Sequence, residues 1–307
     1  MFLRVVSGDA RSGLSPVLRR KSRMSLSLVV VTSLRKALQS FSAVVLTGGS
    51  SGIGKSFIEL CHTLKPEMCL CNLSRTSPPE NIFPNAGKSL NHFPCDLADA
   101  ASVERTAREV EAFLTREVPA GKILLINNSG IGSFAPFRES DLAHELRMID
   151  LNVRAVVQLT ALLLPLLSAR GGTIMNIASV VAYQPTPLAA TYGASKAFVL
   201  NWSVALNEEL RGTGVNALAV CPGTTRTDFF RRAGVGTGRA EAFAMTSAEV
   251  AEAALEAFAA GRVQVVPGWK NKLLTFFGAR VPKPFAAKIS AQMLAREKLG
   301  GDAKGKS

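Results

Sequence analysis

The sequence predicts an α/β fold built on a single doubly wound parallel sheet of about seven strands, with helices on both faces. Two observations predict it: short, continuous apolar runs alternate with longer helical patterns, and a glycine-rich turn follows the first run. Strands that are apolar throughout are buried on both faces, which is typical of parallel sheets covered by helices. The chain has 307 residues, 47% of them apolar, and is long enough for one large core.

The individual elements follow from the length and composition of each run. Runs of about six to nine residues that are apolar and bounded by turn residues indicate buried strands, and longer runs rich in helix formers indicate the intervening helices. The expected strands are 43–49, 68–75, 92–97, 122–130, 172–180, 215–223 and 263–268. The expected helices are 55–64, 101–117, 141–170, which Pro165 is expected to bend, and 191–212.

The charge distribution argues against a nucleic-acid partner. The net charge is +13, but residues 1–40 contribute +7 and residues 262–307 contribute +8, which leaves −2 for residues 41–261. A nucleic-acid enzyme concentrates positive charge around its working site, and here the charge lies at the two ends. The five cysteines contain no C-x-x-C pair and the three histidines are scattered, so we expect reduced thiols and no metal site.

The two ends are expected to lie outside the main domain, which we place at residues 41–268. Residues 1–40 are basic and predicted to be a poorly ordered extension, a transit peptide, or a segment upstream of a start at Met24. We expect a cytoplasmic protein, with a transit peptide not excluded. Residues 269–307 are predicted to form a basic, helical extension that caps the pocket, packs on another subunit or lies on an anionic membrane. We rank capping or packing above membrane contact because Gly278, Pro282 and Pro284 break the segment.

The glycine-rich turn indicates a dinucleotide site. In "TGGSSGIG" (47–54), Gly48, Gly52 and Gly54 lie between the first strand and the first helix, where glycine lets the backbone approach a pyrophosphate at a helix N-terminus. An NAD-specific protein would place an acid near Ser74 to accept from the ribose hydroxyl. The chain instead has Arg75 next, whose guanidinium suits a 2′-phosphate, so NADP(H) is expected over NAD(H).

Several short motifs, taken together and in this order, carry a resemblance to a known family. They are "TGGSSGIG" at 47, "CDL" at 95, "NNSG" at 127, "LNV" at 151, "NIASV" at 176, "YGASK" at 192 and "CPGTTRT" at 221. The chain resembles the short-chain dehydrogenase/reductase family over about residues 41–268, which implies a Rossmann-like fold. The family usually has alanine where this chain has Ser129.

The resemblance implies the roles of individual residues. Asp96 would contact the adenine, Asn127 and Gly130 would shape the floor of the cofactor cleft, and Thr227 would bind the carboxamide. The remaining implied cofactor contacts are Ser50, Ser51, Ile53, Pro222 and Gly223, together with Tyr192 and Lys196. The implied catalytic residues are Asn152, Ser179, Tyr192 and Lys196.

Tyr192 and Lys196 lie four residues apart, on one face of the expected helix. Carbonyl reduction needs a proton donor, and an adjacent ammonium is expected to lower the pKa of the phenol so that Tyr192 acts as acid or base. Ser179 would hold the substrate oxygen, and Asn152 would hold a water that relays protons to Lys196. A mid-helix asparagine can equally serve packing alone.

These expectations converge on an NADP(H)-dependent oxidoreductase that moves a hydride between nicotinamide and a carbonyl or alcohol of an apolar substrate. Residues 227–245 are expected to form a lid, with Phe229 and Phe230 lining an apolar pocket. The alternatives are an NADP(H)-binding protein without turnover and a membrane-associated lipid or ketoacyl reductase. By analogy with the family we expect a homodimer or homotetramer.

Overall fold

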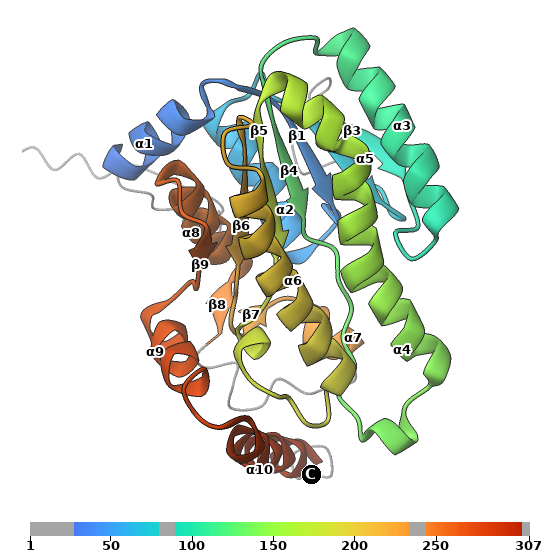
Figure 1. The fold of residues 1–307 in the computed structure, drawn as a ribbon, viewed down its shortest axis with the longest axis vertical. Coiled ribbons are helices and arrows are strands. Elements are labelled where there is room, and N and C mark those ends of the chain that lie inside the picture. Colours follow the sequence, from blue (N-terminus) through green and yellow to red (C-terminus); the bar gives the residue numbers. More distant parts are fainter. Residues whose placement is uncertain (1–27, 80–89, 234–243, 303–307) are drawn as a thin grey trace, which may run out of the picture.

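The computed structural model describes residues 28–79, 90–233 and 244–302, and only the backbone of residues 293–302. Its centre is a seven-stranded parallel sheet in the order β3-β2-β1-β4-β5-β6-β9 (Figure 1). The strands are β1 (Phe41–Thr47), β2 (Cys69–Ser74), β3 (Leu90–Pro94), β4 (Lys122–Asn127), β5 (Gly172–Ile177), β6 (Val215–Val220) and β9 (Gln264–Val265). The predicted doubly wound sheet of about seven strands is therefore confirmed.

Both faces of the sheet are buried at its centre because β1 and β4 are apolar at successive positions. Val44 and Leu46 of β1 face a cluster that contains α1 (Leu28–Leu38), α2 (Gly52–Leu64) and α8 (Ser247–Ala259). Ala43 and Val45, which alternate with them, face α3 (Ala100–Glu117), α5 (Ala155–Arg170) and α6 (Ala190–Glu209). The strand order reverses between β1 and β4, so ligands are expected at the carboxyl ends of these strands.

The N-terminal boundary differs from the sequence-based expectation. Residues 28–38, expected within a poorly ordered extension, form helix α1, whose Leu34 and Leu38 are buried beside α2 and α8. The apolar side chains at i and i+4 give the helix one face that the core can cover. The rest of that predicted extension, residues 1–27, lies outside the described residues.

The long helix expected over 141–170 is divided into three parts. They are α4 (Leu142–Ile149), a π-helical turn (Asp150–Arg154) and α5, which continues through Pro165. The helix is thus interrupted around Asn152 by a wider turn that the sequence did not predict, and such turns occur often at functional sites. Leu142–Arg170 is also the one stretch of the described chain apolar and long enough to cross a membrane, but Leu159, Leu163 and Leu167 are core residues.

The C-terminal part of the domain adds small elements beyond β6. They are the two-stranded pair β7 (Thr225–Arg226) and β8 (Met245–Thr246), α7 (Phe229–Arg232), α9 (Trp269–Gly278) and α10 (Lys283–Asp302). Figure 1 shows α7, α9 and α10 gathered at one end of the molecule. Part of the predicted lid, residues 234–243, lies outside the described residues.

Candidate active site

The glycine turn joins β1 to α2 at the point where the strand order reverses. Gly48 and Gly52 have φ of 75° and 55°, a region that side chains disfavour. A Cβ at Gly54 would lie 2.2 Å from the carbonyl oxygen of Gly48. The turn therefore presents bare backbone at a helix N-terminus, which fits the pyrophosphate of a dinucleotide.

Two asparagines hold the glycine turn in place. The Asn72 Oδ1 accepts a 2.7 Å hydrogen bond from the Gly49 N–H, and the Asn128 Nδ2 donates to the Thr47 carbonyl at 3.0 Å. The side chain of Asn127, expected to shape the cleft floor, donates to Asn176 Oδ1 of β5 at 2.8 Å and to Thr160 Oγ1 of α5 at 3.1 Å. Asn127 thus supports the sheet beneath the cleft, and Asn128, which the sequence analysis missed, contacts the turn.

The remaining residues of the turn divide between core and surface. Ile53 packs against the core cluster of α1, α2 and α8. Ser51 is the N-cap of α2, and its hydroxyl accepts a 3.1 Å hydrogen bond from Arg232 of α7. Ser50 is half-buried beside it. The contact from Arg232 brings the predicted lid segment over the turn.

Arg75 and Asp96 lie at the carboxyl ends of β2 and β3. Asp96 accepts bonds of 3.0 and 2.9 Å from Arg147 of α4. Burial acts to raise the pKa of Asp96, but hydrogen bonds from Arg147 and Ala98 and the charges of Arg147 and Arg75 outweigh it, so the pKa is lowered. Arg75 is exposed and close enough to act on that carboxylate. The expected adenine contact, Asp96, therefore already has a cationic partner, which the sequence analysis missed.

Tyr192 lies near the start of α6, buried and in contact with aromatic side chains. The ring centroids of Phe134 and Phe229 are 5.8 and 5.4 Å from that of Tyr192. The Tyr192 phenol is hydrogen-bonded to Ser179, which follows β5. Ser179 and Tyr192, thirteen residues apart in the sequence, are thus brought together in an apolar wall that suits an apolar substrate.

Lys196 is buried one turn after Tyr192 on α6 and points toward the sheet. Its ammonium donates a 2.8 Å hydrogen bond to the Ile177 carbonyl at the end of β5. A Cβ at Gly130 would lie 3.3 Å from the Lys196 Nζ and 3.2 Å from the Asn152 Oδ1. Gly130 therefore leaves room for both predicted catalytic side chains to reach the cleft.

Asn152 occupies the π-helical turn and is fully buried. Its Oδ1 accepts from the Ile131 N–H at 3.0 Å, and its Nδ2 donates to the Ile131 carbonyl at 2.9 Å and to Ser195 Oγ at 3.0 Å. Ser195 in turn donates to the Tyr192 carbonyl at 2.7 Å. Asn152 thus ties the segment after β4 to the helix that carries Tyr192.

The segment after β6 closes the site from the other side. The Pro222 carbonyl accepts from the Val180 N–H at 2.9 Å, and Gly223 leaves space that Asn271 of α9 fills, since a Cβ there would lie 2.4 Å from the Asn271 Oδ1. A Cβ at Gly52 would lie 3.1 Å from the Thr227 Cγ2. Thr227 therefore faces the glycine turn.

The pKa shifts of the two central groups run against the expectation from their spacing. Burial raises the pKa of Tyr192 to about 12, and the hydrogen bond with Ser179 acts in the opposite direction. Burial lowers the pKa of Lys196 to about 8, although the nearby Cys221 acts to raise it. In this structure burial therefore outweighs the lowering of the Tyr192 pKa expected from Lys196, because loss of hydration penalises both charged forms.

The comparisons with known proteins point to one family. The family model described as "short chain dehydrogenase" matches residues 42–237. The ketoacyl reductase HetN of Nostoc sp. is 30% identical over 218 residues, which cover 67% of this chain and 74% of that protein. The very-long-chain 3-oxoacyl-CoA reductase of Neurospora crassa is 30% identical over 196 residues, 60% of this chain and 56% of that protein.

A solved structure of a related protein has a similar fold. A short-chain dehydrogenase from Sphingobium yanoikuyae, in complex with NADPH, superimposes with a TM-score of 0.66 at 30% identity and covers 78% of this chain and 94% of its own. The chain belongs to the short-chain dehydrogenase family. It is an NAD(P)-dependent oxidoreductase.

Proposed function

We propose that the chain is an NADP(H)-dependent reductase or dehydrogenase that acts on a carbonyl or secondary alcohol of an apolar substrate, with Tyr192 as general acid and base. The observation that carries this proposal is the hydrogen bond between Tyr192 and Ser179, inside a wall that Phe134 and Phe229 form. A reacting oxygen beside these two hydroxyls would have both a proton donor and a second hydrogen-bond partner.

The side chains divide the chemical work. The bound nicotinamide supplies the hydride. Tyr192 donates its proton to the carbonyl oxygen in reduction and takes it back in oxidation, while Ser179 holds that oxygen. Lys196 places an ammonium one turn away, and Asn152 positions α6 through Ser195 and is the candidate holder of a relay water.

Arg75 supports a preference for NADP(H). It follows β2 directly, is exposed, and stands where the ribose of a bound dinucleotide is read in this class of fold. The residues beside it are Ser74 and Thr76, so the strand end carries no acid to favour a free 2′-hydroxyl. The related Sphingobium structure holds NADPH, which agrees with the same preference.

The test is steady-state oxidation of NADPH and NADH by the full chain against a panel of apolar ketones and 3-oxoacyl thioesters. We expect turnover with NADPH at a kcat/KM about tenfold or more above that with NADH, since a charge-assisted hydrogen bond contributes about 1.5–3 kcal/mol. Arg75→Ala should remove the preference by slowing the NADPH reaction alone. Arg108→Ala, which changes an exposed arginine on α3, is the matched control.

Two results would count against the proposal. Tight cofactor binding without turnover of any carbonyl would favour a binding protein without catalysis, and an unchanged preference in Arg75→Ala would remove the assigned role of that residue. The cytoplasmic location and the homodimeric or homotetrameric state stay predictions from the sequence.

A further inference from the structure

The helices α9 and α10 expose an unusual number of large apolar side chains. Among the described residues, fifteen large apolar side chains are exposed, and seven of them lie on these two helices. Trp269 is 70% exposed, and Phe277 and Phe285 are each 58% exposed. The seven are Trp269, Leu273, Leu274, Phe276, Phe277, Phe285 and Ile289, and we call them the apolar face. A concentration of this kind marks an interaction surface.

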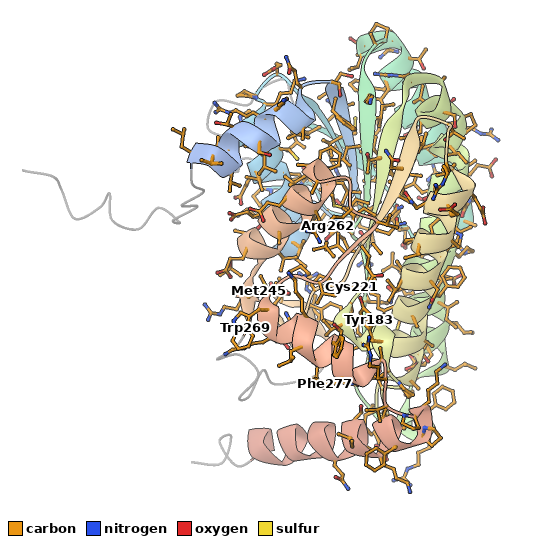
Figure 2. All side chains as sticks on the ribbon, turned by 60° about the vertical axis from the view of Figure 1, so that its left-hand side comes forward. Tyr183, Cys221, Met245, Arg262, Trp269 and Phe277 are labelled. Carbon is orange, nitrogen blue, oxygen red and sulfur yellow. The ribbon has the colours of Figure 1, made fainter. Side chains whose placement is uncertain are left out.

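On α9, the residues of the apolar face lie opposite the residues that anchor the helix to the domain. Trp269, Leu273, Phe276 and Phe277 follow the i, i+4, i+7, i+8 spacing of one helical face. On the inner side, Thr275 is buried and Asn271 fills the space at Gly223. Figure 2 places Trp269 and Phe277 toward the two ends of α9. The exposed rings are therefore held on a fixed scaffold.

The charge around the apolar face is of one sign. Lys270, Lys272, Lys283 and Lys288 lie on the same two helices, and Arg280 lies in the connection between them. The chain has no Asp or Glu from residue 257 to residue 296. The Arg280 guanidinium lies 3.6 Å from the centre of the Phe276 ring, so its charge is held directly over an apolar group. Aromatic rings flanked by lysine and arginine are the composition of helices that lie at the surface of anionic bilayers.

We propose that α9 and the first half of α10 dock on the surface of an anionic phospholipid bilayer. Charge decides among the possible occupants. A second copy of the chain would bring its own five cations against these five, and residues 1–27 hold six Lys/Arg against one Asp, so both would be repelled. An anionic lipid surface instead attracts each cation while the interfacial region takes up the rings.

Docking in this way would turn the catalytic end of the molecule toward the bilayer. Figure 1 shows α9 and α10 at the end that also carries α7 and β7–β8, and α9 contacts the 3-10 turn Val180–Tyr183 that follows Ser179. Resting on the proposed function, this orientation points to lipid-dissolved carbonyl compounds as the substrate class. The docking itself does not depend on the enzyme activity.

Flotation of the full-length protein with phospholipid vesicles tests the docking. We expect the protein to float with vesicles of phosphatidylcholine mixed with phosphatidylserine, far less with phosphatidylcholine alone, and less as salt is raised. The double variant Trp269→Ser/Phe277→Ser should bind the mixed vesicles at least about tenfold more weakly, since each ring leaves the interface. Lys272→Glu/Lys288→Glu should lose at least about tenfold as well.

The matched control keeps the change in net charge but moves it to another helix. Arg108→Glu/Arg116→Glu on α3 alters two exposed arginines away from the apolar face and should bind within about twofold of the unaltered chain, because docked lipid would not reach them. Turnover of a water-soluble ketone should be the same in all variants. Turnover of a ketone dissolved in the vesicles should fall only in the apolar-face and Lys272/Lys288 variants.

The possible contrary results are distinct. The docking would be overturned if the unaltered protein did not float with mixed vesicles. It would also be overturned if the apolar-face and lysine variants floated as well as the control variant. A smaller particle on size exclusion for Trp269→Ser/Phe277→Ser without lipid would assign the face to a second copy and overturn it too. Absence of turnover on any ketone, with flotation intact, would overturn the proposed function and leave the docking standing.

Discussion

Tyr192 and Lys196 are adjacent on α6, and burial shifts the pKa of each toward its neutral form. A pKa of about 12 keeps the Tyr192 phenol protonated at neutral pH, as a proton donor must be. The hydrogen bond with Ser179 favours the phenolate, so the protein prepares the acid through its hydroxyl partner. We therefore expect the Lys196 charge to lower the pKa of Tyr192 only in the complex with cofactor and substrate, and not in the free protein.

The lowered pKa of Lys196 predicts how the stability of the fold depends on pH. The unfolded lysine keeps its proton up to about 10.5 while the folded one loses it at about 8, so the unfolded state binds more protons between these values. The free energy of unfolding should thus gain from Lys196 as pH rises from about 8 toward 10.5. In Lys196→Met this gain should disappear.

Urea unfolding at pH about 7 and about 9.5 measures this gain, and the difference between the two pH values is compared among variants. Lys36→Met, which changes an exposed lysine on α1, is the control and should keep the difference found in the unaltered chain. The same difference in Lys196→Met would show that Lys196 does not titrate in this window.

At the scale of elements, the π-helical turn between α4 and α5 is the structural device that carries Asn152 into the site. A regular α-helix through 141–170 would turn the Asn152 side chain in another direction. The wider turn lets Asn152 bond to Ile131 on one side and to Ser195 on the other. The turn therefore couples two segments that surround the catalytic side chains.

Replacement of Asn152 should lower the free energy of unfolding. Asn152→Ala removes both hydrogen bonds to the Ile131 backbone and the bond donated to the buried Ser195 hydroxyl, so the free energy of unfolding should fall by about 2–4 kcal/mol. Asn201→Ala removes an exposed asparagine that donates to the Ala197 carbonyl, and should change the free energy of unfolding by less than about 0.5 kcal/mol. Urea denaturation of both variants compares them, and equal effects would contradict the coupling role.

At the scale of the whole molecule, the positions set by strand ends and helical spacing were predictable. The glycine turn and the Tyr192–Lys196 pair follow from where the first apolar run stops and from the i, i+4 rule, whereas Ser179 was implied by the resemblance to the family. The contact of Asn128 with the glycine turn was not predictable, because successive residues at a strand end point in opposite directions and the exact last residue decides which side each of them faces. The Asp96–Arg147 pair was missed because it depends on how α4 packs.

Two further helices, α1 and α8, were not predicted, because composition averaged over a long segment conceals a short helix. The basic composition of residues 1–40 concealed α1, whose buried face consists of only a few apolar positions. Helix α8 did carry a local signal, since Thr246 and Glu249 form a capping box at its start. Tertiary packing, rather than composition, determines where such short elements lie.

The docking of α1 gives a prediction about the stability of the whole domain. Leu34 is buried against the core, so Leu34→Ala should lower the free energy of unfolding by about 2–5 kcal/mol. Leu28→Ala, in the same helix but 81% exposed, should change it by less than about 0.5 kcal/mol. Thermal or urea unfolding of the full chain compares them, and a Leu34→Ala chain as stable as Leu28→Ala would mean that α1 does not pack on the domain.

The assignment of Tyr192 as the proton donor is tested most directly by exchanging each of the two tyrosines for phenylalanine. Tyr183 lies beside Cys221 (Figure 2), to which it is hydrogen-bonded, and serves as the matched control. Tyr192→Phe should lower kcat for ketone reduction by about 10²–10⁴-fold, with the affinity for NADPH retained, whereas Tyr183→Phe should stay within a few-fold of the unaltered chain. Full turnover by Tyr192→Phe would contradict the assignment.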